Sequence, residues 1–297
     1  MTTNTDEILE IDNQKVEVAA YENITYSQPI GRLTDRSINL KMDILKPRVD
    51  RKLPAVLYIP GGGFIRSHKE SSIQQRLALA EAGYLVASIE YRTVPSGKFP
   101  DALVDVKSAI RFLKANAEKY GLSRNKIAVM GASAGGYLAA LTGTTNEHTS
   151  FDLGDFLEED SSVNAIIDLY GVSNLGNIAK DFSEETQKKH ESAASSEALF
   201  LNGIPPFDDP QDDLSKLIQK SDPAVYISAD TPPFLIMHGD KDQIVSPSQS
   251  SYLYDALKES GISAKKYIVK NAEHGGSYWV QPEIIKIFVD FLDEHIN

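Results

Sequence analysis

Cysteine is absent from this chain of 297 residues. A disulfide framework, a thiolate zinc site and a cysteine nucleophile are therefore excluded. Apolar runs of about 18 residues are also absent, so we expect no membrane span. Residues 1–14 are polar and acidic and lack the basic start and apolar run of a signal peptide, which predicts a cytoplasmic protein.

Positive charge is scarce as well. The chain has 30 Lys and Arg residues against 42 Asp and Glu residues, which gives a formal net charge of -12. Binding to nucleic acid or to an anionic membrane depends on Lys and Arg, so neither partner is expected. Small or neutral molecules are the predicted partners, and the sequence leaves the oligomeric state open, a homo-oligomer included.

Short apolar runs alternate with amphipathic stretches along most of the chain. The runs lack the polar–apolar alternation of a half-exposed strand, which is typical of buried strands in a parallel sheet. Residues 101–119 repeat apolar side chains every three or four positions, which predicts a helix. The alternation predicts an α/β fold, with a mainly parallel sheet flanked by helices on both faces. The predicted strands cover residues 55–59, 84–91, 127–130, 165–170, 234–237 and 266–269, and further helices cover 137–141, 248–257 and 283–291.

Two segments interrupt this pattern, although we predict a single domain over residues 1–297. Residues 17–45 are predicted to form antiparallel edge strands from the stretches VEVAAY, NITY and LKMDIL. Residues 172–230 are polar and contain several prolines. We expect this second segment to be a short, partly helical cap inserted between two strands, where long inserts often carry specificity.

The sequence Gly-Ala-Ser-Ala-Gly at residues 131–135 directly follows a predicted strand and directly precedes a predicted helix. A nucleophilic serine in a strained strand–turn–helix junction needs such small neighbours. Ser133 is therefore the candidate nucleophile. The alternative interpretation is a glycine-rich turn without catalytic function.

A serine hydroxyl needs an adjacent base to become a good nucleophile. In α/β sheets with this kind of junction, an acid and then a histidine follow the serine along the chain. Only His274 and His295 come late enough, and His295 lies on the predicted terminal helix. His274 follows a predicted strand, at the edge of the sheet where catalytic groups gather. It is the candidate base, and a surface histidine is the alternative.

The acid is expected after the strand at residues 234–237, where Asp240 and Asp242 both occur. It must accept the imidazole N–H and stabilise the imidazolium. Spacing alone does not distinguish the two aspartates. His238, which ends that strand, is interpreted as a structural residue.

Three consecutive glycines, Gly61 to Gly63, follow the strand at residues 55–59. Their backbone N–H groups can approach a developing oxyanion closely. The predicted donors are the N–H groups of Gly62, Gly63 and Ala134. A phosphate-binding loop is the alternative, but no Lys-Ser/Thr pair follows these glycines.

Several motifs together resemble one family over nearly the whole chain. They are PAVLYIPGGGF, EYRTVPSGKFPDALVDVKSAIRFL, IAVMGASAGGYLAAL, SDPAVYIS, PPFLIMHGDKDQIV and NAEHGG. This chain resembles the acetyl esterase/lipase group of α/β hydrolases, the His-Gly-Gly-Gly branch that includes feruloyl-esterase-like carboxylesterases. The resemblance implies the α/β-hydrolase fold, and it implies Asp242 as the acid, three residues before Val245. One departure is Pro60, which stands where the family usually has the histidine before the glycines.

The resemblance implies a serine carboxylesterase that acts on short-chain acyl, acetyl or feruloyl-like phenolic esters and needs neither metal nor cofactor. It also implies a structural ion pair beneath the site, formed by Arg92 and Asp105. Two other functions are weighed: a serine peptidase of the prolyl-oligopeptidase type, and a non-catalytic relative that binds ligands. Phe64, Tyr278 and Trp279 adjoin the candidate residues, so they line a substrate pocket or serve as core or rim aromatics.

Overall fold

The computed structural model describes residues 7–204 and 213–297. This part of the chain forms one eight-stranded sheet in the order β1-β2-β4-β3-β5-β6-β7-β8. The pairings β1–β2 and β2–β4 are antiparallel and all others are parallel. The strands are β1 (Val18–Ser27), β2 (Leu40–Pro47), β3 (Leu53–Ile59), β4 (Leu85–Ile89), β5 (Leu122–Ala132), β6 (Ala165–Leu169), β7 (Phe234–Gly239) and β8 (Ala264–Val269).

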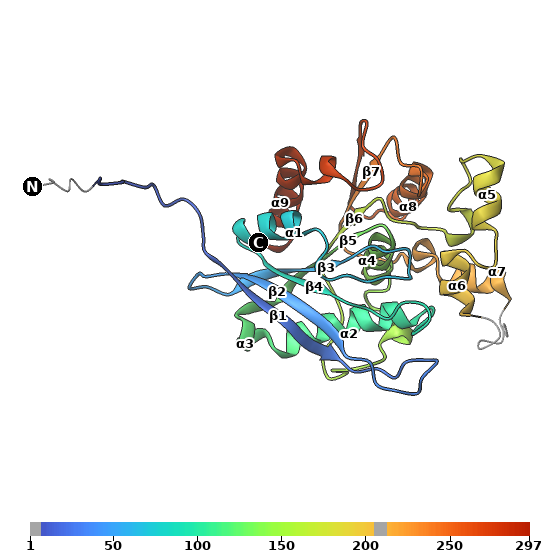
Figure 1. Ribbon diagram of the computed structural model, residues 1–297, viewed down its shortest axis with the longest axis horizontal. Coiled ribbons are helices and arrows are strands. Elements are labelled where there is room, and N and C mark those ends of the chain that lie inside the picture. The colour runs from blue at the N-terminus through green and yellow to red at the C-terminus, as the bar shows by residue number, and fades with distance from the viewer. Residues whose placement is uncertain (1–6, 205–212) are drawn as a thin grey trace, which may run out of the picture.

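Helices cover both faces of this sheet (Figure 1), which confirms the predicted α/β architecture. The α-helices are α1 (Ile73–Glu81), α2 (Asp101–Ala115), α3 (Ala117–Tyr120), α4 (Ala134–Thr144), α5 (Glu184–His190), α6 (Ser196–Asn202), α7 (Leu214–Lys220), α8 (Pro247–Glu259) and α9 (Pro282–Ile296). The 3₁₀ turns are η1 (Thr149–Phe151), η2 (Leu175–Asn177), η3 (Pro223–Tyr226) and η4 (Ser277–Val280). No helix in the two described ranges combines the length and the apolar character needed to cross a bilayer.

The central strands are buried on both faces, and alternate residues serve two separate cores. Ala55 and Leu57 of β3 pack in the cluster that includes α2, α4 and α8. Val56 and Tyr58 of the same strand pack in the cluster that includes α1 and α9. This double burial explains why the strand sequences lack a polar face.

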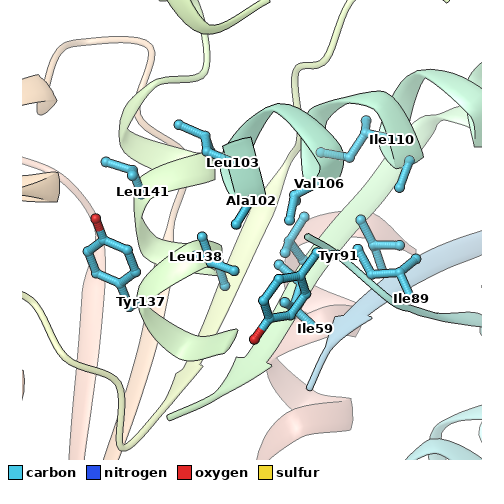
Figure 2. Close-up of a cluster of buried hydrophobic side chains, with 14 of the residues drawn as sticks. Ile59, Ile89, Tyr91, Ala102, Leu103, Val106, Ile110, Tyr137, Leu138 and Leu141 are labelled. Carbon is cyan, nitrogen blue, oxygen red and sulfur yellow. The ribbon is translucent and has the colours of Figure 1, made fainter. Parts of the chain in front are cut away.

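Helix α2 shows how the predicted apolar stripe is used. Figure 2 shows Val106 and Ile110 of α2 and Leu138 of α4 among the side chains of the buried cluster that also contains residues of the strands. These side chains are fully buried. The predicted helix at residues 101–119 is interrupted at Asn116, so it forms α2 and the short α3.

The N-terminal strands differ in detail from the prediction. The stretches VEVAAY and NITY join into the single strand β1, whose pairing with β2 shifts register between Tyr21 and Ile24. Asn23, between them, has a φ of 58° and donates its backbone N–H to Asp43. Of these two strands only β1 lies at an edge of the sheet, because β2 also pairs with β4.

The segment predicted as a cap, residues 172–230, lies between β6 and β7. Its described part contains η2, α5, α6, α7 and η3. Residues 205–212, with three of its prolines, lie outside the described residues. Helices α5, α6 and α7 gather at one end of the molecule, away from α1 and α9 (Figure 1).

Candidate active site

Ser133 lies between the end of β5 and the start of α4, in the predicted strand–turn–helix junction. Its backbone has φ 56° and ψ -121°, a conformation that is strained for any residue with a side chain. Such a turn raises the serine hydroxyl above the end of the sheet.

The glycines on either side of Ser133 are required by close packing. A Cβ atom on Gly131 would lie 2.0 Å from the carbonyl oxygen of Gly135. A Cβ atom on Gly135 would lie 2.0 Å from the carbonyl oxygen of Ile59, at the end of β3. The junction therefore presses directly against the neighbouring strand, and this packing fixes the position of the serine.

His274 joins Ser133 and Asp242 in one chain of hydrogen bonds. Its Nε2 lies 2.8 Å from Ser133 Oγ, and its Nδ1 lies 2.6 Å from Asp242 Oδ2. A carboxylate only accepts, so Nδ1 carries the proton and Nε2 is left to accept the hydroxyl proton of the serine. The three side chains follow β5, β7 and β8, strands that are far apart in the sequence; β7 and β8 are neighbours in the sheet, and β6 lies between them and β5.

The structure places Asp242, and not Asp240, against the imidazole. Asp242 is 2% exposed, and its Oδ1 accepts the backbone N–H groups of Ile244 and Val245 at 2.8 and 2.9 Å. Asp240 is exposed and accepts the backbone N–H of Asn271. The two aspartates therefore differ in burial and in partner.

Burial raises the pKa of Asp242, but hydrogen bonds from His238 and His274 outweigh it and hold this pKa below its ordinary value. His238 Nε2 lies 3.1 Å from Asp242 Oδ2 and 3.0 Å from the carbonyl oxygen of Val245. Both partners are acceptors, so Nε2 donates, and His238 Nδ1 lies 2.7 Å from Ser250 Oγ. His238 therefore stabilises the loop that carries Asp242, here called the acid loop, and Asp242 stays ionised.

The glycine loop lies directly beside the serine. A Cβ atom on Gly61 would lie 3.1 Å from Ser133 Cβ and 2.7 Å from the carbonyl oxygen of Ala132. Gly62 and Gly63 have φ values of 149° and 58°, which favour glycine. Within residues 7–204 and 213–297, the backbone N–H groups of Gly62, Gly63 and Ala134 donate to no other group.

Pro60 replaces the histidine that the resemblance would place before the glycines. Its carbonyl oxygen accepts a hydrogen bond from Tyr91 Oη at 3.0 Å. Tyr91 is buried, and burial raises the pKa of its phenol. The tyrosine at the end of β4 thus anchors the start of the glycine loop.

The next residue, Arg92, forms the ion pair predicted with Asp105. Its Nη2 lies 2.8 Å from Asp105 Oδ1, and its backbone N–H and Nε donate to the same carboxylate. Burial raises the pKa of Asp105, and the bonds from Arg92 oppose the rise, which leaves the pKa at about 6. The pair fixes the chain that follows Tyr91 onto helix α2.

We expect Asp105→Ala to lower the free energy of unfolding by about 3 kcal/mol, because it leaves the guanidinium of Arg92 largely buried with Asp101 as its one remaining ion-pair partner in the described part of the chain. Urea unfolding monitored by circular dichroism measures the change. Asp255→Ala, at an exposed position of α8, is the control and should stay within about 0.5 kcal/mol of the parent. Equal effects of the two substitutions would contradict a stabilising role for the pair.

The three aromatics suggested for a substrate pocket are not equally accessible. Phe64 is 3% exposed and stacks on Phe200 at 4.1 Å between ring centroids. Trp279 is 2% exposed and donates its indole N–H to the carbonyl of Glu273. For these two residues the structure favours the alternative, a packing role, because neither ring presents surface to a ligand. Tyr278 is 43% exposed and remains available.

Tyr170 is a neighbour of the candidate base that the sequence analysis did not identify. It directly follows β6, and its ring lies 4.8 Å from that of His274 and 4.6 Å from that of Trp279. Its φ is 42°, and its backbone N–H donates to the carbonyl of Met237. Its place after a parallel strand is the signal that would have identified it.

Asp168, within β6, is a second residue that the sequence analysis missed. It is fully buried, and its Oδ1 accepts the backbone N–H of Gly171 at 3.0 Å. Its Oδ2 has no hydrogen-bond partner among the described residues. Burial raises the pKa of Asp168 to about 7, although the charge of His238 and the bond from Gly171 act against the rise.

No group of three or more His, Asp or Glu side chains in the described ranges is arranged to hold a metal ion. The arrangement around Ser133 instead combines a hydroxyl, an imidazole, a carboxylate and unpaired backbone donors. These are the groups used for nucleophilic attack on an acyl carbon.

Comparison with known proteins gives consistent relatives. The chain is 31% identical over 207 residues to the probable carboxylic ester hydrolase LipM of Mycobacterium tuberculosis, which covers 69% of this chain and 45% of that protein. It is 26% identical over 268 residues to the isoprenylcysteine alpha-carbonyl methylesterase ICME of Arabidopsis thaliana, with 87% of this chain and 60% of that protein covered. The chain thus spans about half the length of the curated relatives it matches.

Solved structures share the fold over nearly the whole chain. A truncated carbohydrate esterase from gut microbiota has a TM-score of 0.79 at 25% identity, over 95% of this chain and 98% of that one. A bifunctional GH43-CE protein of Bacteroides eggerthii has a TM-score of 0.77 at 28% identity, over 93% of this chain and 38% of that one. The model of the BD-FAE family matches residues 42–257. The chain therefore has the predicted α/β-hydrolase fold and belongs to the BD-FAE family.

Proposed function

We propose that this protein is a serine carboxylesterase that hydrolyses short-chain acyl, acetyl or feruloyl-like phenolic esters through an acyl-enzyme. The observation that supports this most strongly is the continuous chain of hydrogen bonds from Ser133 through His274 to Asp242, beside three unpaired backbone donors. A serine, a base, an acid and an oxyanion site are the complete set that acyl transfer requires.

In the proposed reaction, Ser133 Oγ attacks the ester carbonyl carbon while His274 Nε2 takes the hydroxyl proton. Asp242 accepts the Nδ1–H of the imidazole and stabilises the imidazolium that forms. The N–H groups of Gly62, Gly63 and Ala134 donate to the oxyanion of the tetrahedral intermediate. His274 then gives its proton to the departing alcohol, which leaves the acyl group on Ser133.

A water molecule completes the cycle by the same steps. His274 takes a proton from the water as its oxygen attacks the acyl carbon, and Ser133 leaves with that proton. The net reaction consumes one ester and one water and releases one acid and one alcohol. The proposal needs no metal or organic cofactor.

The relatives support ester chemistry and a small acyl group. Their names include a carboxylic ester hydrolase, a methylesterase and a carbohydrate esterase. A further solved structure, at 25% identity and a TM-score of 0.71, is an acetyl ester-xyloside bifunctional hydrolase from Caldicellulosiruptor lactoaceticus. The sequence between β6 and β7 is polar, which favours short or polar substrates over long lipids.

A substrate panel tests the proposal against both alternatives. We expect p-nitrophenyl acetate, p-nitrophenyl butyrate and methyl ferulate to be hydrolysed faster than p-nitrophenyl octanoate, and peptide p-nitroanilides to be cleaved slowest. Faster cleavage of the anilides would favour the peptidase. Absence of turnover, together with failure of a fluorophosphonate to label Ser133, would favour the non-catalytic ligand-binding protein.

A further inference from the structure

A cavity of about 350 Å³ lies between η2, α5, α6 and α7. This volume is near the lower end of the range for small-molecule sites. None of its lining residues is Ser133, Asp242, His274 or a glycine of the loop at residues 61–63. It is therefore a different space from the candidate active site.

Helix α6 separates the two spaces. Ser196 and Phe200 lie one turn apart and face the active-site side. If Gly63 carried a Cβ atom, it would lie 3.7 Å from Ser196 Oγ. Phe200 stacks on Phe64. Glu197 and Leu201 line the cavity instead. Residues three or four apart share a helix face, so this division follows from the helical repeat.

The cavity wall is mainly apolar but includes one paired polar group. Leu175, Ile178 and Ile218 supply apolar surface. His190 Nδ1 lies 2.6 Å from Glu197 Oε1, and Glu197 is only 4% exposed. The other oxygen of Glu197 accepts the hydroxyl of Ser196 at 3.0 Å, so this carboxylate is held on both sides.

This pairing determines what the cavity can recognise. The carboxylate of Glu197 accepts, so Nδ1 of His190 carries a proton, and in the neutral imidazole Nε2 is an acceptor. Within the described ranges, His190 Nε2 has no partner. Gln187 also lines the cavity and uses its side-chain N–H group toward the carbonyls of Lys180 and Phe182, which leaves its oxygen free to accept.

The polar lining therefore offers acceptors at His190 and Gln187 beside the ammonium group of Lys180, and carboxylates outnumber ammonium groups there. Glu191 and Glu197 lie in the lining against Lys180. A ligand that donates a hydroxyl proton fits this lining, whereas a carboxylate would meet like charge. We propose that the cavity is a binding site, separate from Ser133, for a small aryl or alkyl alcohol whose hydroxyl donates to His190.

Titration with 2-naphthalenemethanol, followed by its fluorescence, tests the proposal on the full chain. We expect a Kd between about 0.1 and 1 mM, which is ordinary for a ligand of this size. Its methyl ether, which lacks the donor, should bind about tenfold more weakly. Sodium 2-naphthoate should bind more weakly than the ether. Equal affinities of the alcohol and the ether would overturn the proposal, and this comparison needs no substitution in the protein.

Two matched substitutions locate the site. Ala198→Trp places a large ring in the cavity and should weaken binding of the alcohol at least tenfold. Ala194→Trp, at an exposed position before α6 and outside the lining, should leave the affinity unchanged. Circular dichroism verifies that both variants fold. Unchanged binding by a folded Ala198→Trp variant would place the alcohol elsewhere and refute the site.

Discussion

Ser133→Ala is expected to lower kcat/KM for p-nitrophenyl acetate by at least about 1,000-fold. The substitution removes the proposed nucleophile and leaves the oxyanion donors, which retain only part of the rate enhancement. Alanine should be tolerated, because the hydroxyl of Ser133 makes a single hydrogen bond within the described chain, with His274. Steady-state hydrolysis measures the loss, and thermal unfolding verifies the fold.

Ser173→Ala is a matched control for this result. Ser173 is buried where Ser133 is half-buried, follows the neighbouring strand β6, and has an unpartnered hydroxyl among the described residues. Activity of this variant should stay close to that of the parent. If Ser133→Ala retains most of the activity, another nucleophile carries the reaction and the proposed role of Ser133 is wrong.

Asp242→Asn should reduce kcat by about 1,000- to 10,000-fold while leaving the structure nearly unchanged. An amide at this position can present N–H to His274 Nδ1, which favours the tautomer that carries its proton on Nε2 and cannot accept from the serine. The shape of the side chain is retained, so the backbone donors from Ile244 and Val245 can keep an oxygen acceptor. Measurement of kcat at saturating p-nitrophenyl acetate separates this effect from binding.

Asp240→Asn is the control for Asp242→Asn, two residues away on the same loop. Asp240 is exposed, and its carboxylate accepts a hydrogen bond from the backbone N–H of Asn271. We expect less than a threefold change in kcat, because no contact links this carboxylate to the imidazole. A loss comparable to that of Asp242→Asn would show that the loop as a whole, and not the acid, supports the rate.

The central part of the fold could be predicted because a strand that is buried on both faces has an almost entirely apolar sequence. The runs at residues 55–59, 127–130 and 234–237 are apolar throughout, and all three are central strands. Helix α2 was equally clear, since its apolar stripe faces the sheet. These elements position the serine and the acid loop.

Helix α1 was not predicted, and its buried face explains why. Gln75 and Arg76 lie on that face beside Leu79 and Ala80. Their polar groups are paired with backbone carbonyls, Gln75 with Trp279 and Arg76 with Ser71. A pattern of hydrophobic spacing does not reveal polar residues that are buried because backbone carbonyls outside the helix accept their hydrogen bonds.

The candidate site was predictable where its residues stand in a short motif and not where they depend on tertiary packing. The glycines around Ser133 mark the junction because a Cβ atom there would collide with backbone. Spacing left Asp240 and Asp242 equal, since they lie two residues apart on one loop and the fold of that loop decides which carboxylate is buried. The pair of His190 and Glu197 joins α5 to α6 through space, and neither residue belongs to a motif.

The buried carboxyl of Asp168 adds the uptake of a proton to folding between about pH 4 and pH 7. Its pKa is about 7 in the folded chain against an ordinary value of 3.8, so the folded form keeps a proton that the unfolded form releases. Below about pH 4 both forms are protonated and the group imposes no penalty. As the pH rises from about 4 to about 7 the penalty grows, and above about 7 it stays constant, so this one side chain makes the native sheet less favourable at neutral and alkaline pH than at acidic pH.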